Sequence, residues 1–165
     1  KVAEPEFPEY VEKFNSDYDK ELCLIPSDVI EFIKESQPKK YQSLADQYGE
    51  AVDKKIIERV ASEVKKRKTL DIFREKIKDR SQTLDMVYFK PVHSKTPEHL
   101  EGYKKNRLSI IRQLKYSKKN TNSIDIVLFL NGLPVVTMEL KNALTGQYLH
   151  QAIKQYIQDQ LKSSD

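Results

Sequence analysis

The sequence contains few cysteines and glycines, the two residues on which many cofactor sites depend. Cys23 is the only cysteine, so an intrachain disulfide and a zinc site built from cysteines are both excluded. A reducing, cytoplasmic setting is expected. Four glycines occur, and none of them opens a GxxxxGK[ST] loop or a GxGxxG turn. Neither kind of nucleotide-phosphate cradle is therefore predicted.

Long apolar runs are also absent. No stretch approaches the ~20 apolar residues needed to span a bilayer. The acidic, proline-punctuated first residues do not resemble a secretory signal. We therefore expect no membrane partner. His93, His99 and His150 form no HExxH pattern, and ordinary surface or loop roles are expected for them.

Charge is abundant, because 33% of the 165 residues are charged, and the net charge is +4. A chain of this length forms one domain with a real core. The mild positive balance permits nucleic-acid binding without requiring it. Seven cations lie shortly before the most informative segment of the chain, and they predict either a nucleic-acid contact or a solvated surface: Lys104, Lys105, Arg107, Arg112, Lys115, Lys118 and Lys119.

The first part of the chain is predicted to be helical. Ser27 is a suitable N-cap for a helix that opens at Pro26 and stops at Pro38. A longer helix is expected over 41–67, because its apolar residues form one stripe. Thr69 is expected to cap a shorter helix that reaches Ile77.

From about residue 84 the pattern changes to strands. Strands are predicted over 84–89, 108–116, 123–130 and 133–142, with a polar loop of at most one helical turn over 92–106. A helix over 147–162 follows. This order predicts an α+β fold in which helices cover a mostly antiparallel β-meander.

Two carboxylates and a lysine interrupt the last two strands. Asp125 precedes Glu139 by fourteen residues, and Lys141 follows two further on. Ionised groups are costly to bury unless they are paired or bind a metal. Asp125, Glu139 and the carbonyl of Leu140 could give Mg²⁺ its oxygen ligands, with Lys141 positioning a water. The alternative is that Asp125 caps a sheet edge and that Glu139 and Lys141 form a surface pair.

The turn between these strands gives a geometric test. A simple two-residue type I′ turn at Asn131-Gly132 would pair Asp125 with Met138, so that Asp125 and Glu139 would face opposite sides of the sheet. A three-residue loop, or a bulge within one strand, would place both carboxylates on one face. A shared metal therefore predicts that this hairpin is not a simple type I′ hairpin.

Further motifs follow one another over residues 69–158. They include Phe89-Lys-Pro, Tyr103-Lys-Lys-Asn-Arg-Leu, Leu144-Thr-Gly-Gln and Ala152-Ile-Lys-Gln-Tyr. Together with the Asp125 and Glu139 segments, they resemble the N-terminal domain of the restriction (R) subunit of type I restriction–modification enzymes. That domain is a PD-(D/E)XK endonuclease, so the resemblance implies the same fold for this chain. The first 65 residues match less distinctly.

The resemblance implies a type I site-specific deoxyribonuclease that hydrolyses DNA phosphodiesters with Mg²⁺. Asp125, Glu139 and Lys141 correspond to its two acids and its lysine, and Gln155 corresponds to a glutamine on the next helix. An acidic residue from the long helix is represented by Asp53 or Glu63. The residues expected to contact DNA are Arg112, Lys115, Lys118, Lys119, Tyr148 and Gln151.

The resemblance also implies partners and an organisation. The partners are double-stranded DNA and the modification and specificity subunits, the latter carrying base recognition. Residues 68–165 would form the nuclease core, and the helical region 1–67 would belong to the same domain or form a docking subregion. The chain would stop before an ATP-dependent motor, so ATP would serve the full-length subunit without binding here. The alternatives are a non-catalytic docking fragment, or a stand-alone resolvase or repair nuclease.

Overall fold

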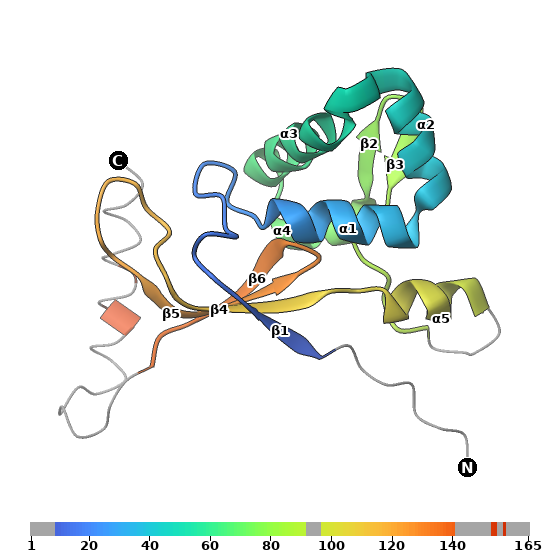
Figure 1. Ribbon diagram of the computed structural model, residues 1–165. Helices are drawn as coiled ribbons and strands as arrows, with labels where there is room; N and C mark the ends of the chain where they lie inside the picture. The colour runs from blue at the N-terminus through green and yellow to red at the C-terminus, as the bar shows by residue number, and fades with distance from the viewer. Residues whose placement is uncertain (1–8, 92–96, 141–152, 155–156, 158–165) are drawn as a thin grey trace, which may run out of the picture.

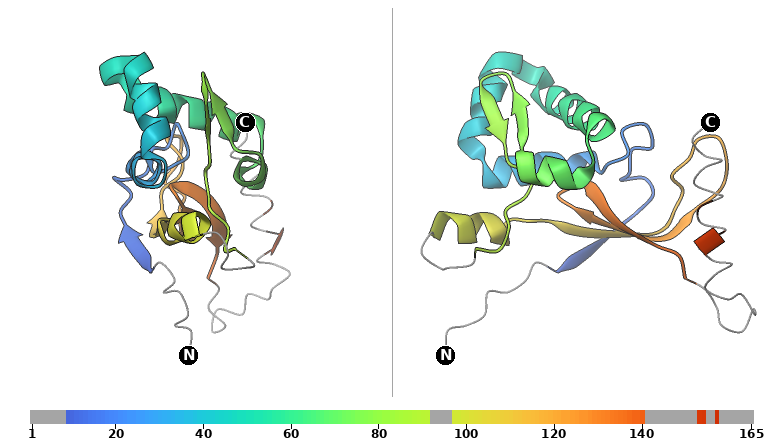
Figure 2. Two further views of the ribbon diagram at one scale, coloured as in Figure 1. Left: turned by 90° about the vertical axis from the view of Figure 1, so that its right-hand side faces the viewer. Right: turned by 180° about the vertical axis from the view of Figure 1, so that it is seen from behind.

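The computed structural model describes residues 9–91, 97–140, 153–154 and 157. A cluster of helices lies on one side of a four-stranded sheet, over the turn that joins the last two strands (Figures 1 and 2). The expected mixture of helices with a mostly antiparallel sheet is confirmed. In the described part of the chain, no helix has the length and apolar composition needed to cross a bilayer.

The sheet has the strand order β1-β4-β5-β6. Strands β4 (Leu108–Leu114), β5 (Ile124–Leu130) and β6 (Leu133–Met138) form the predicted antiparallel meander. The sequence did not predict β1 (Tyr10–Lys13), which pairs with β4 in the parallel direction. Its first three residues are all exposed, so it lacks the apolar alternation that marks a strand.

The helices begin and end differently from the prediction. Helix α1 (Pro26–Ser36) is confirmed, but its N-cap is Ile25, so the prediction that Ser27 caps it is wrong. Pro38 begins a second helix, α2 (Pro38–Tyr48), because proline needs no hydrogen-bond acceptor in a first turn. The single helix expected over 41–67 is wrong. Gly49 adopts φ +59°, which ends α2, and the 3₁₀ turn η1 (Gly49–Ala51) leads into α3 (Val52–Lys66).

The segments after α3 also differ. Helix α4 (Thr69–Glu75) ends before Ile77, which instead starts β2 (Ile77–Asp79), paired with β3 (Gln82–Leu84) in a separate hairpin. Residues predicted as a loop contain helix α5 (Pro97–Lys104), where Glu101 and Lys104 form an ion pair of 3.2 Å. The predicted helix over 147–162 lies outside the described residues, apart from three helical positions, 153, 154 and 157.

Residues 85–89 do not form the predicted strand. Their alternating side chains resemble a strand, but buried side-chain amides replace a neighbouring strand. The Gln37 amide donates to the Asp85 carbonyl (2.7 Å) and accepts from the Asp85 N–H (2.8 Å). Asn106 makes the equivalent pair with Tyr88, at 2.7 and 3.2 Å. The backbone N–H and carbonyl groups of Asp85 and Tyr88 are thereby satisfied without a ladder.

Two apolar clusters hold these parts together. The larger lies between the helices and includes Leu133 at the start of β6. The smaller lies on the sheet and contains Ile25, Ile111, Leu114, Ile124, Val127 and Phe129. Ile25 comes from the segment before α1, so that segment covers the sheet face on which Ile111, Val127 and Phe129 project. The sheet and the helical cluster are therefore packed through the start of α1.

A buried carboxylate fixes β1 to this core. Asp28, in the first turn of α1, is 1% exposed. Its Oδ1 lies 3.0 Å from Lys13 Nζ, and its Oδ2 accepts a hydrogen bond from the Ser109 hydroxyl. A buried charge is costly without a partner, so Lys13 and Ser109 together keep Asp28 satisfied.

We predict that Lys13→Ala lowers the free energy of unfolding by about 2 kcal/mol. The change leaves the Asp28 charge buried, although Ser109 and the first turn of α1 still stabilise it. Urea denaturation followed by circular dichroism measures the loss. Lys39→Ala on the exposed surface of α2 is the control and should leave the urea midpoint unchanged. Equal midpoints for the two variants would show that Lys13 does not stabilise Asp28.

Candidate active site on the β5–β6 hairpin

The hairpin turn is formed by Asn131 and Gly132, which both adopt positive φ, +51° and +81°. Leu130 pairs with Leu133 across it, so the loop has two residues. Asparagine tolerates the left-handed region, and glycine adopts it at little cost. The Asn131 side chain is fully buried, and its amide donates to the Met86 carbonyl at 2.9 Å. The turn is thus held against the segment 85–89.

A β-bulge then changes the register of the hairpin. Phe129 pairs with Pro134, but Leu128 pairs with Val136, so Val135 is an extra residue in β6. Proline cannot donate to a ladder, and a bulge beside it on an edge strand avoids that defect. The sequence allowed a three-residue loop or a bulge within one strand. The hairpin has the bulge and keeps the two-residue turn.

The shifted register brings the two carboxylates to one face. Beyond the bulge Val127 pairs with Thr137 and Ile126 pairs with Met138. Continuing this register by one residue puts Asp125 opposite Glu139, and residues directly opposite each other in an antiparallel pair share a face. Without the bulge Asp125 would lie opposite Met138.

Asp125 is held from both sides. The Gln113 amide donates to its Oδ1 and the Leu140 N–H donates to its Oδ2, each at 2.7 Å. The Ser123 hydroxyl in turn donates to Gln113 Oε1 at 2.9 Å. A carboxylate offers about four acceptor positions, so these two hydrogen bonds are compatible with coordination of a cation. The side chain of Glu139 is exposed at the open edge of this face.

This donor set fits a hard divalent cation. Mg²⁺ is usually bound by one or two carboxylates with water and substrate phosphate completing its shell. Asp125 and Glu139 would supply the carboxylates, and Glu139 is exposed to the solvent from which water and substrate would approach. Among the residues that the structure describes, no three histidine, cysteine or acidic side chains cluster as a closed metal cage would require.

Four residues predicted for this site, Lys141, Tyr148, Gln151 and Gln155, lie outside the described residues. The two acids considered on the long helix are engaged elsewhere. Asp53 is bound by Lys34 (2.9 Å) and by the Tyr41 hydroxyl (2.6 Å). Burial opposes its ionisation, but these hydrogen bonds hold the pKa of Asp53 below its ordinary value.

Glu63 is equally occupied. Its carboxylate lies 3.3 Å from Arg59 on the same helix and 2.9 Å from Arg67, the residue directly after that helix. These contacts tie the end of α3 to α4, because Arg67 also pairs with Glu75 at 3.1 Å. Its described contacts therefore serve the packing of the helices.

The basic residues predicted to contact DNA divide into two groups. Lys115, Lys118 and Lys119 lie in the loop between β4 and β5, next to the end of the sheet that carries Asp125. Lys118 forms an ion pair with Glu21 there. Arg112 pairs with Ile126 across the ladder, so it projects to the opposite sheet face, where it lies 3.4 Å from Glu12.

Sequence reasoning missed Gln113. Gln113 is exposed near the end of β4, between Arg112, which pairs with Ile126, and Leu114, which pairs with Ile124. It therefore lies across from Asp125 on the neighbouring strand. The apolar alternation of β4 gives no signal for this residue, because Gln113 is exposed and Leu114, directly after it, is buried. The φ of Gln113, +50°, turns the strand at this point.

A search of curated proteins found no match, and a search of solved structures found none. A family model described as "Type I restriction enzyme R protein N terminus" matches residues 1–165, the whole chain. The chain therefore belongs to the family of type I restriction enzyme R protein N-termini.

Proposed function

We propose that this chain is the Mg²⁺-dependent endonuclease domain of a type I restriction enzyme R subunit, with a PD-(D/E)XK nuclease fold. The bulge at Val135 carries the proposal, because it puts Asp125 opposite Glu139 on one face of the hairpin. Family membership supports the same reading, since R subunits belong to restriction enzymes. The substrate is double-stranded DNA, and its phosphodiester bonds are hydrolysed.

Asp125, Glu139 and the carbonyl of Leu140 would hold Mg²⁺ in this proposal. The bound ion would polarise a phosphoryl oxygen and lower the pKa of a coordinated water. Gln113 and the Leu140 N–H keep the Asp125 carboxylate oriented, so it needs little rearrangement on binding. Lys141 would position the attacking water, and Gln155 would support it from the following helix.

The reaction adds water across one P–O bond. The water oxygen attacks phosphorus, and the bond to the leaving deoxyribose oxygen breaks. That oxygen takes up a proton, and the attacking water loses one. Lys141 offsets the negative charge that develops on the phosphoryl group in the transition state.

Positioning of DNA falls to cations and polar groups around this end of the sheet. Lys115, Lys118 and Lys119 are proposed to contact phosphates. Arg112 is proposed to do so from the opposite sheet face, and the resemblance adds Tyr148 and Gln151, which lie outside the described residues. Phosphate contacts carry no base information, so sequence choice would come from the specificity subunit. Binding should weaken steeply with added salt.

Chelation tests the metal requirement. We expect the chain to nick supercoiled plasmid with Mg²⁺, to fall to background in EDTA, and to recover when Mg²⁺ is restored in excess. Titration calorimetry with Mn²⁺ should detect one bound ion in the wild type and none in Asp125→Asn. Nicking that persists in EDTA, or Mn²⁺ binding that survives in Asp125→Asn, would contradict the proposal.

A further inference from the structure

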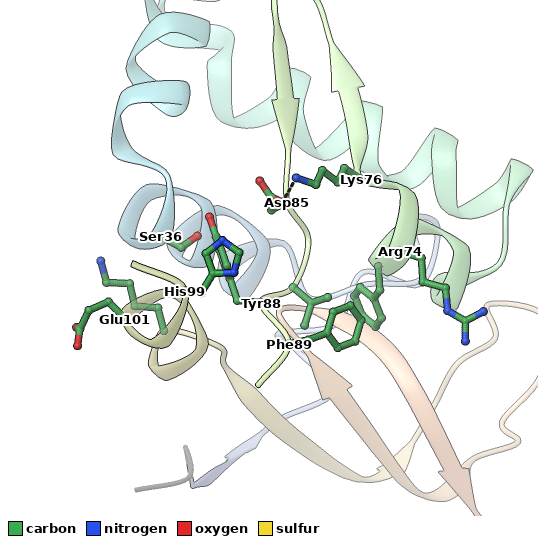
Figure 3. Close-up of a pocket in the computed structure, with 12 residues that line it drawn as sticks. Ser36, Arg74, Lys76, Asp85, Tyr88, Phe89, His99 and Glu101 are labelled. Atoms are coloured by element: carbon green, nitrogen blue, oxygen red, sulfur yellow. Dashed lines mark ion pairs between the residues drawn. The ribbon is translucent and has the colours of Figure 1, made fainter. Parts of the chain in front are cut away.

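A cavity of about 770 Å³ lies at the other end of the hairpin from Asp125. It is bounded by the end of α1, by α4, by residues 85–89 and by α5 (Figure 3). Asn131 binds the Met86 carbonyl beside it, and Asp125 is five residues from Leu130, or about 17 Å along β5. The cavity therefore does not belong to the candidate active site.

One wall of this cavity is aromatic. Phe73, Tyr88 and Phe89 line it, and Phe89 is 61% exposed although it is a large apolar side chain. The Tyr88 ring is fixed from behind by α5, since a Cβ added to Gly102 would lie 2.6 Å from that ring. A fixed aromatic wall with an exposed ring is a surface on which a planar group can stack.

Three basic side chains, Arg74, Lys76 and Lys105, and two carboxylates, Asp85 and Glu101, also line the cavity. Lys76 Nζ lies 2.8 Å from Asp85, and Lys40 Nζ lies 2.7 Å from the same carboxylate. Two ammonium groups contact one carboxylate, so the three side chains together keep a net positive charge. The Arg74 side chain extends from α4 at the rim, away from the Lys76–Asp85 pair (Figure 3).

The backbone at Lys76 is strained. It adopts φ +62° and ψ 177°, a region populated almost only by glycine. Glycine would serve better for the backbone alone, yet a lysine occupies the position and presents its side chain, 51% exposed, to the cavity. Residues held in such regions concentrate at ligand-binding sites.

We propose that this cavity binds one unpaired nucleotide, with its base stacked on Phe89 and its phosphate at Lys76. The bases of a duplex are stacked on one another, so only an unpaired one can offer its face to the wall. That the nucleotide belongs to a DNA strand rests on the proposed function. That the cavity binds a nucleotide rests on its lining residues alone. A free nucleotide shares that chemistry and is the other source.

Fluorescence anisotropy of the full chain with a fluorescein-labelled oligothymidylate, in EDTA and low salt, tests this inference. Phe89→Ala is expected to weaken binding roughly tenfold, because stacking on an aromatic side chain is lost. Leu70→Ala is the matched control: Leu70 is 62% exposed on α4 and does not line the cavity. It should bind as the wild type does.

Lys76→Gly separates binding from folding. The variant should weaken binding by about fivefold while its melting temperature stays the same or rises, because glycine relieves the strained φ. Lys39→Ala removes one positive charge from an exposed residue that does not line the cavity, and it should leave binding near the wild-type value. Competition by thymidine monophosphate would identify a free nucleotide as the source, and competition by oligothymidylate alone would identify a strand.

Three results would overturn the inference. The first is equal affinity for the oligothymidylate in Phe89→Ala and Leu70→Ala. The second is an equal loss of affinity in Lys76→Gly and Lys39→Ala. The third is tighter binding of a blunt duplex than of the single strand. No cleavage occurs in EDTA, so the outcome is independent of the nuclease assay. A chain that binds single strands through Phe89 but never cuts would refute the proposed function alone.

Discussion

Glu139→Gln is expected to reduce Mg²⁺-dependent cleavage by about a thousandfold and to leave the urea midpoint unchanged. The substitution keeps the size of the side chain and removes the charge that would bind the cation. Glu139 is exposed, so the change disturbs little packing. Plasmid nicking under single-turnover conditions measures the rate, and Mn²⁺ calorimetry measures the loss of binding directly.

Asp125→Asn should have the same effect on cleavage with an added loss of stability. An asparagine has one oxygen acceptor, whereas Asp125 accepts from Gln113 and from the Leu140 N–H. One of these donors would face the new amide group, at a cost of about 1 kcal/mol. Glu50→Gln, on the exposed 3₁₀ turn, is the matched control and should cut at the wild-type rate. Wild-type cleavage by folded Glu139→Gln would refute the assignment of this site.

Gly132→Ala should lower the free energy of unfolding by about 4 kcal/mol, the largest stability change that we predict for one methyl group. Gly132 has φ +81°, a conformation that costs an L-residue about 1–2 kcal/mol. An added Cβ would also lie 2.5 Å from the Ile25 carbonyl oxygen and 2.6 Å from Val29 Cγ2. Relief of that overlap requires a backbone shift, which costs about 1–3 kcal/mol more.

The shift would also strain the hydrogen bond from the Ile25 N–H to the Gly132 carbonyl, which measures 2.9 Å. Thermal unfolding should therefore occur about 10 °C lower than in the wild type. Gly49→Ala is an instructive comparison, because Gly49 also has positive φ but no atom lies within 4 Å of its added Cβ. It should cost only about 1 kcal/mol. Equal losses at the two glycines would show that crowding against Ile25 is unimportant.

The hairpin was the most predictable part of the molecule. Its two apolar runs and its Asn-Gly turn are local signals, and the spacing of Asp125 and Glu139 limited the geometry to a longer loop or a bulge. The choice between them was not local. It depends on Pro134, which cannot donate to the ladder, and on how β6 meets β5. The roles of Asp125, Glu139 and Lys141 stay predictions that the proposed variants test.

The wrong predictions of helices and strands also concern features that are not determined by the local sequence alone. A proline is compatible with the end of one helix and with the start of the next. At Pro38 the packing of the neighbouring residues decides that a second helix begins there. Gly49 breaks an apolar stripe that runs on both sides of it, so periodicity alone could not locate the break. β1 has too few buried residues to be recognised, although Lys13 is needed by a carboxylate on α1.

The segment 85–88 has a consequence for the order of folding. Its backbone partners are the side chains of Gln37, Asn106 and Asn131, which lie far apart along the chain. Contacts of large sequence separation form late, because the intervening chain must first be brought together. These four residues become ordered only when α1, the entry to β4 and the hairpin turn have assembled. The cavity wall that contains Tyr88 and Phe89 is therefore expected to become ordered late in folding. Hydrogen exchange at the Asp85 and Tyr88 amides measures when this wall has formed.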